Sequence, residues 1–141
     1  MNSIVRITIA CTALAVSNGV LARGTVPLVD HENMDVVTGS GKPAQVEAVR
    51  KAILTAGANS PRRWLMTQVD GGKSIHATTT VRSHTVTIDI VASATKFSIR
   101  YVDSVDMKYG TDRAGKPVIH PFYNQWVTEL LRSINKELPS L

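Results

Sequence analysis

The sequence predicts an α+β fold, a two-layer sandwich in which two helices cover one face of a four-stranded antiparallel sheet. Three observations lead to this prediction. Amphipathic helical patterns flank a central region, four strand-like runs fill that region, and the connections between the runs have hairpin length. Short connections favour antiparallel pairing, and strands with one apolar face need a cover on one side only.

The first part of the domain predicts an edge strand and then a helix. Residues 34–38 form a short β-prone run, and residues 39–42, Gly-Ser-Gly-Lys, break it. Pro43 suits the first position of a helix, because the N–H that it lacks would have no partner there. Over residues 44–56 the apolar side chains recur at helical spacing, and Gly57 is a typical C-terminal end. The apolar positions are Val46, Val49, Ile53 and Ala56.

Four strand-like runs come next. Residues 64–69 lead into Asp70-Gly71-Gly72-Lys73, a strong hairpin signal. Residues 74–82 and 85–92 alternate apolar and polar side chains, and the run from Phe97 continues this alternation toward Tyr109. Residues 110–117 are predicted to form a polar loop.

The last element is a helix that Pro121 opens. Its apolar side chains form one broad stripe, which predicts that the helix packs on the sheet. They are Tyr123, Trp126, Val127, Leu130, Ile134 and Leu138.

Residues 1–22 have the layout of a secretory signal peptide, so they are set apart from the fold. Arg6 is their only charge, an apolar run covers residues 7–16, and Val20-Leu21-Ala22 resembles a cleavage site. The sequence therefore predicts a periplasmic or secreted product that is cleaved near Ala22. Residues 23–33 are interpreted as a flexible lead-in, and residues 34–141 as one α+β domain.

Composition narrows the function classes. The 141 residues carry a net charge of +5 and one cysteine, Cys11, which lies in the predicted signal peptide. Cleavage would leave 119 residues with no thiol and a net charge of +4. A disulfide framework and a thiolate metal site are then excluded. The scattered basic residues argue against nucleic-acid binding. No apolar run in the cleaved chain is long enough to span a membrane, and the sequence around Cys11 argues against a lipid anchor.

The open face of the sheet is the first candidate binding surface. The predicted strand pairs place Thr78 opposite Asp89, His76 opposite Val91, and Arg100 opposite Asp89. Asp89 and Arg100 would then form a cross-strand ion pair among threonines. This surface is either a polar binding platform or a solvated sheet face, because β-propensity alone also selects threonine.

The start of the last helix is the second candidate. His120, Tyr123 and Asn124 lie in the segment richest in unusual side chains, and together they could line a ligand pocket. The structural alternative makes His120 a partner of the free amides in the first helical turn and Tyr123 a core residue. The four histidines show no metal-binding spacing, so neither a metal nor another cofactor is predicted, and no catalytic residue is assigned.

Several segments together resemble a family of small bacterial envelope proteins of unknown function, many of which are carried as lipoproteins. The resemblance extends over residues 36–138 and implies an envelope location but no activity. This chain departs from the family in having no convincing lipid-attachment cysteine. The segments are Val37-Thr38-Gly39-Ser40-Gly41-Lys42, Trp64, Ile88-Asp89-Ile90, Ser98-Ile99-Arg100-Tyr101-Val102-Asp103-Ser104 and Ile119-His120-Pro121-Phe122-Tyr123-Asn124-Gln125-Trp126.

Two functional hypotheses follow. The first is an exported, non-catalytic binding or accessory domain that contacts an envelope protein through its open sheet face or through a sheet edge at residues 34–38. The alternative is a small-ligand binder or hydrolase that uses His120, Tyr123 and Asn124 with Asp103 or Ser104.

Overall fold

The structure is a computed structural model that describes residues 24–141. The predicted signal peptide, with Cys11 and the cleavage position at Ala22, lies outside the described residues. In chain order the elements are β1 (Val26–Pro27), β2 (His31–Asp35), α1 (Val46–Asn59), β3 (Leu65–Val69), the 3-10 turn η1 (Asp70–Gly72), β4 (Ser74–Val81), β5 (His84–Ala92), β6 (Lys96–Val105), β7 (Gly110–Thr111), β8 (Pro117–Ile119), α2 (Phe122–Glu137) and the 3-10 turn η2 (Leu138–Ser140).

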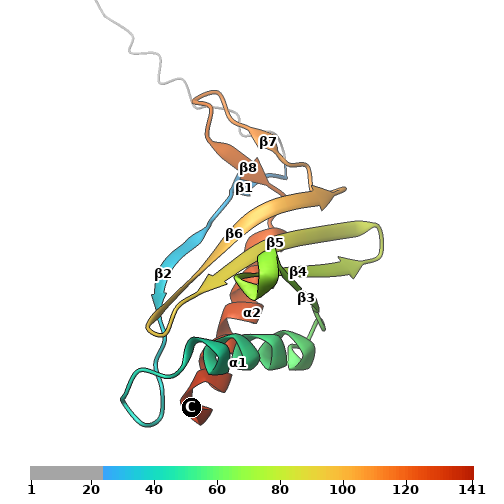
Figure 1. Ribbon diagram of the computed structural model, residues 1–141. Coiled ribbons are helices and arrows are strands. Elements are labelled where there is room, and N and C mark those ends of the chain that lie inside the picture. Colours follow the sequence, from blue (N-terminus) through green and yellow to red (C-terminus); the bar gives the residue numbers. More distant parts are fainter. Residues whose placement is uncertain (1–23) are drawn as a thin grey trace, which may run out of the picture.

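The strands form two antiparallel sheets (Figure 1). The larger sheet has five strands in the order β2-β6-β5-β4-β3. The smaller sheet has three short strands in the order β1-β8-β7 and extends from one end of the larger one. The prediction of a single four-stranded sheet is therefore wrong, although the α+β class holds.

The sequence did not indicate β1, β7 and β8, and the edge strand predicted at residues 34–38 is β2, which covers His31–Asp35 in the structure. β1, β2, β7 and β8 are short, and Pro27 and Pro117 lie within two of them. In addition, β1 and β2 pair with strands that are distant in the chain: β1 pairs with β8, and β2 pairs with β6. Periodicity reports local amphipathicity and carries no information about such partners. The structure thus places β1 and the start of β2 in the segment predicted as a flexible lead-in, and it places β7 and β8 around the predicted polar loop.

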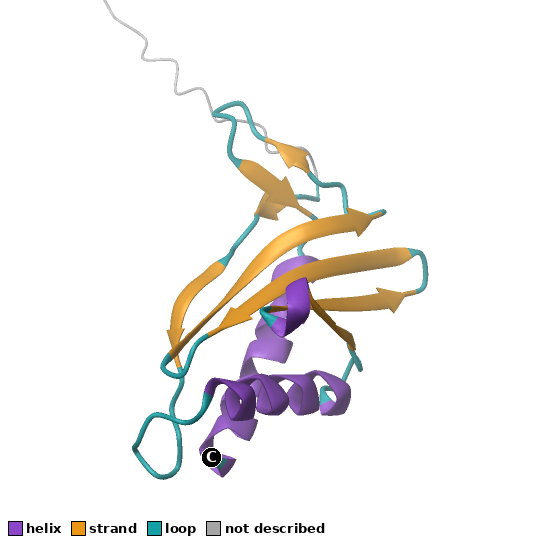
Figure 2. Ribbon diagram, viewed as in Figure 1, coloured by secondary structure: helices purple, strands orange, loops and turns teal. Residues whose placement is uncertain are grey.

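Both helices lie on the same side of the five-stranded sheet (Figure 2), and the main core lies between the two layers. The inward side chains of the central strands are the apolar members of the predicted alternation, such as Ile75, Ala77, Ile88 and Ile90, each at most 1% exposed. The apolar stripe of α2 is buried as predicted, from Tyr123 to Leu138. The opposite face of the sheet has no helix over it among the described residues.

The first helix differs from its prediction at both ends. It begins at Val46, after Pro43, because residues 38–42 form a loop in which the Thr38 hydroxyl donates to the Lys42 carbonyl at 2.7 Å. It also continues through Gly57 to Asn59. Gly57 lies against the Met66 side chain of β3, which would have to move to make room for a Cβ at this position. Its carbonyl also accepts the Trp64 amide at 3.0 Å, which starts the path into β3.

The register of the central hairpin also differs. The predicted pairing of Thr78 with Asp89 and of His76 with Val91 is wrong, because Val81 pairs with His84 and the turn is formed by Arg82 and Ser83. His76 therefore lies opposite Asp89, and Thr78 lies opposite Thr87. Arg82 has φ of 57°, a left-handed conformation that glycine or asparagine usually signals in a sequence. The predicted pairing of Asp89 with Arg100 is confirmed.

Neither helix of the described region combines the length and the apolar character that crossing a membrane would require.

Candidate functional site

The open face of the five-stranded sheet carries rows of hydroxyl groups. Thr78 and Thr87 face each other across β4 and β5 with their Oγ1 atoms 3.0 Å apart, and Thr80 and Thr85 repeat this contact at 3.0 Å. Either hydroxyl of each pair can donate, so each pair retains donor and acceptor capacity toward solvent. β-Branched side chains on a regular strand also lose little freedom when a partner binds, because few χ1 rotamers are open to them.

Arg100 forms an ion pair on this face, but not with the predicted residue. Its Nε and Nη2 atoms donate to Glu32 of β2 at 2.5 and 2.8 Å, a bidentate arrangement. The Arg100 hydrogen bond lowers the pKa of Glu32, and the same contact raises the pKa of Arg100. Both side chains are about half exposed, at 52% and 45%. The pair fixes the guanidinium over β2 and β6 and leaves it accessible to solvent.

Asp89 has different partners from the one predicted. The hydroxyl of Ser74 donates to the Asp89 Oδ1 atom, and the His76 Nε2 atom lies 3.6 Å from the same oxygen. Asp89 thus lies between a serine and a histidine. A catalytic triad needs the imidazole between the carboxylate and the hydroxyl, because the imidazole must take the hydroxyl proton. This cluster therefore has the residue types of a triad without the order that would activate Ser74.

His120 lies at the start of α2 and caps it. Its Nδ1 atom accepts the Phe122 amide at 3.2 Å, and Pro121 between them already has helical dihedrals of −53° and −28°. The structural alternative predicted for His120 is therefore confirmed. An Nδ1 acceptor requires that the proton of the neutral ring be on Nε2. Metal binding through Nε2 would displace that proton and break the cap, so His120 is poorly suited to hold a metal.

Tyr123 and Asn124 point to different surroundings. Tyr123 is 0% exposed, and its hydroxyl has no hydrogen-bond partner among the described residues. Burial raises the pKa of Tyr123 far above its usual value. Asn124 instead holds the N-terminal segment: its Oδ1 atom accepts the Val29 amide at 3.1 Å, and its Nδ2 atom donates to the Pro27 carbonyl at 2.8 Å. The three side chains are neighbours in sequence, but they do not present free polar groups to one pocket.

A cluster that the sequence did not indicate surrounds His120. The His84 ring stacks on the His120 ring with centroids 5.7 Å apart, and the Phe122 ring lies 4.5 Å from His120. His84 Nδ1 is 2.8 Å from the Asp106 carbonyl oxygen, and because a carbonyl oxygen can only accept, Nδ1 is the donor in this hydrogen bond. Burial, followed by the nearby His84 and Lys108, lowers the pKa of His120 below its ordinary value of 6.5.

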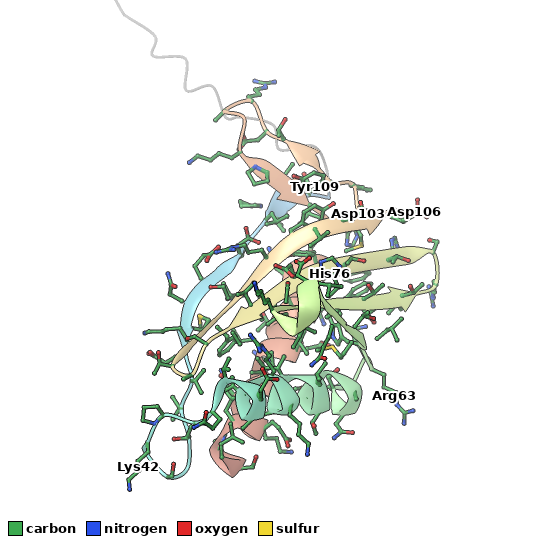
Figure 3. All side chains as sticks on the ribbon, viewed as in Figure 1. Lys42, Arg63, His76, Asp103, Asp106 and Tyr109 are labelled. Atoms are coloured by element: carbon green, nitrogen blue, oxygen red, sulfur yellow. The ribbon has the colours of Figure 1, made fainter. Side chains whose placement is uncertain are left out.

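Asp103 and Ser104 lie toward the end of β6 and bond locally. The Ser104 amide donates to the Asp103 carboxylate at 2.8 Å, and the Ser104 hydroxyl lies 2.9 Å from the Tyr101 hydroxyl. Burial raises the pKa of Tyr101, so this phenol is no base for Ser104. Figure 3 shows Asp103 at this end of the molecule, together with Asp106 and Tyr109.

Three surface depressions of the described region lie away from these groups, whereas a fourth, beside β2, is lined by Arg100, Ser98 and Val91. The one of about 540 Å³ lies between α1 and α2 beside Asn59 and Arg132, and the one of about 350 Å³ lies under the loop that contains Lys42. The other two, of about 250 and 260 Å³, lie beside β2. In the part of the chain that the structure describes, no group of three histidine, cysteine, aspartate or glutamate side chains is placed to bind a metal.

No family model, no curated protein and no solved structure matches the chain.

The resemblance to bacterial envelope proteins accordingly stays a prediction. Of the five candidate residues, only Asp89 and Arg100 share a surface, and each binds a different partner there. Sequence reasoning missed Glu32, because this residue lies in the segment predicted as a flexible lead-in, and it missed Ser74, because the predicted hairpin register was shifted. It also missed the stacking of His84 on His120, which joins segments that no local pattern connects.

Proposed function

We propose that the chain is an exported, non-catalytic binding domain that contacts another protein of the bacterial envelope through the open face of its five-stranded sheet. The observation that carries this proposal is the one-sided cover of that sheet. Both helices pack on one face, while the other face keeps the threonine pairs, Asp89 and the Glu32–Arg100 ion pair in contact with solvent.

The chemistry of this face favours a polar protein partner. Hydroxyl pairs both donate and accept hydrogen bonds, so they match the mixed donors and acceptors of a folded protein surface. Charges on the rim of such a surface orient the partner and add specificity. Val91, 41% exposed, supplies apolar contact on this face.

The alternative, a ligand pocket or hydrolase at His120, Tyr123 and Asn124, has less support. His120 Nδ1 and both polar atoms of Asn124 are engaged within the chain. The Tyr123 hydroxyl is closed off from solvent. A ligand there would have to replace these contacts before making its own.

Site-specific photo-crosslinking in the producing cell tests the face. A photoreactive side chain at Thr80, which is exposed on the open face, should give a discrete crosslinked protein. The same group at Lys51, exposed on α1, is the matched control and should not capture that protein. The double variant Thr80→Arg/Thr85→Arg should reduce crosslinking from Thr78. Identical crosslinked products from Thr80 and Lys51 would contradict the proposal.

The proposed location has a separate test. Mass spectrometry of the protein isolated from the cell envelope should find Arg23 as a free N-terminus. An intact N-terminus in the cytoplasmic fraction, or a lipid-modified Cys11, would overturn the proposed export and cleavage without affecting the assignment of the binding face.

A further inference from the structure

The two edges of the five-stranded sheet differ in how they are protected from pairing. β2 forms one edge, and its pairing with β6 is interrupted by a bulge between His31 and Met34. Asn33 within the bulge has φ of 53°, and its amide is bonded to the Ser98 hydroxyl at 3.0 Å. Lys96 and Asp35 form an ion pair at the end of this edge. Bulges and charges of this kind are the usual means of preventing edge-to-edge association.

β3 forms the other edge and has none of these features. All five of its residues, Leu-Met-Thr-Gln-Val, pair with β4 in unbroken register. The strand contains no charged residue and no proline. Among the described residues β4 is its only strand neighbour. Leu65 on this edge is 70% exposed, the largest exposed fraction among the exposed large apolar side chains of the described region. A regular, uncharged edge with an exposed leucine is a site where another strand can add.

The two ends of β3 carry opposite charges that have no partner within the described chain. Arg63 precedes the strand and Asp70 follows it. Neither side chain has a hydrogen bond or ion pair with another described residue, whereas the adjacent Arg62 is held by Glu129 at 2.8 Å. Figure 3 shows the Arg63 side chain extending away from the body of the molecule. The edge is therefore basic at its start and acidic at its end.

We propose that β3 pairs with β3 of a second copy of this chain, antiparallel and about a twofold axis at Thr67. Of the registers that keep both open faces on the same side, this one pairs all five residues of each strand. Leu65 then lies opposite Val69 of the second copy, and Thr67 lies opposite Thr67. Arg63 of each copy comes beside Asp70 of the other, so the symmetric arrangement matches both free charges twice.

This pairing joins two five-stranded sheets into one continuous sheet. Leu65, whose side chain lies on the open face opposite Thr78, gains Val69 of the second copy as a neighbour, and the unpaired backbone groups of β3 gain partners. Both open faces come to lie on one side, which doubles the surface available to a partner. The proposal stands on the edge strand and its charges, so it does not depend on the function proposed for the open face.

Analytical ultracentrifugation of the purified protein over a range of concentrations tests the pairing. We expect a monomer–dimer equilibrium whose dissociation constant rises at least about tenfold in Leu65→Lys, because the change places a charge at each end of the paired segment. Leu65 is exposed in the monomer, so this substitution should leave folding intact. Val37→Lys, at a position that is 64% exposed in a loop remote from β3, is the matched control and should not change the constant.

Charge reversal tests the register. Arg63→Asp and Asp70→Arg should each weaken the dimer several-fold to about tenfold, because each turns two attractions into repulsions. The double variant Arg63→Asp/Asp70→Arg should restore the wild-type constant. A protein that stays monomeric throughout, a dimer that Leu65→Lys does not weaken, or a double variant no better than the single ones would overturn the proposal.

Discussion

The imidazole of His84 stacks on the imidazole of His120, with ring centroids 5.7 Å apart and planes inclined by 26°. The stack joins the start of β5 to the start of α2, which are elements of opposite layers. His120 also accepts the Phe122 amide, so its neutral form caps the helix. A proton on Nδ1 would end this cap and would place a positive charge beside His84, Lys108 and the positive end of the helix dipole.

Stability should therefore fall on the acid side of neutrality. The pKa of His120 in the folded protein lies below the ordinary value of 6.5, chiefly because the ring is partly buried. As the pH falls from 6.5 through the folded pKa, the unfolded chain binds the proton first, so the free energy of unfolding decreases. His120→Asn keeps a side-chain acceptor at the cap and does not titrate. Urea unfolding at a series of pH values should show a smaller acid-side loss in this variant, and an equal loss in both proteins would contradict the assignment.

Asp89 should contribute to stability through Ser74. Ser74 is 7% exposed, and its hydroxyl donates to Asp89. Asp89→Ala leaves this hydroxyl without a protein acceptor, at a cost of about 1–2 kcal/mol, whereas Asp89→Asn keeps the Oδ1 acceptor and should cost less than about 1 kcal/mol. Chemical denaturation measures both. Equal losses in the two variants would show that the negative charge, and not the hydrogen bond to Ser74, is what matters.

Removing the Tyr123 hydroxyl should be tolerated. This group is buried and has no partner among the described residues, so Tyr123→Phe removes an unsatisfied donor from the core. The free energy of unfolding should stay the same or rise by up to about 1 kcal/mol. A loss of more than about 1 kcal/mol in thermal or chemical denaturation would mean that the hydroxyl has a bound water or another partner.

Gly39 should resist substitution, although it lies in a loop. A Cβ at this position would collide with the backbone carbonyl of Pro139, and the neighbouring Ser40 amide donates to the Leu141 carbonyl at 3.3 Å. Gly39→Ala should therefore cost about 1–3 kcal/mol, because the C-terminal turn must move. Gly110→Ala is the control: open space surrounds it, and the change should be neutral or stabilise by up to about 1 kcal/mol. Denaturation midpoints compare the two variants.

The sequence predicted the elements whose stability is local. The alternation of β4 and β5 and the apolar stripe of α2 are both properties of contiguous residues, and the inward side chains follow them. The α+β class and the cover of one sheet face follow from these elements.

What the sequence could not predict depends on contacts between distant segments. β1 contains Pro27 and has only two residues, so it exists because β8 pairs with it. Gly57 lies within the helix against Met66, which lies in the next element. The register of the β4–β5 hairpin depends on Arg82, whose left-handed conformation cannot be predicted from its residue type. The same holds for the candidate site. Asp89 and Arg100 were correctly predicted to lie opposite each other, but Asp89 contacts Ser74 and His76 of β4, and Arg100 contacts Glu32 of β2.

The pairing of the N-terminal strands with late segments has a consequence for how the protein is made. A chain that emerges with its N-terminus first presents β2 long before β6, and Pro27 of β1 long before Val118, its partner in β8. Asn124 of α2, which hydrogen-bonds the Val29 amide and the Pro27 carbonyl, is synthesised only after most of the chain is complete. Early in synthesis the N-terminal end therefore stays extended and unpaired, and the native sheet closes late. Late closure is compatible with the export proposed above, because a translocation channel passes unfolded chain.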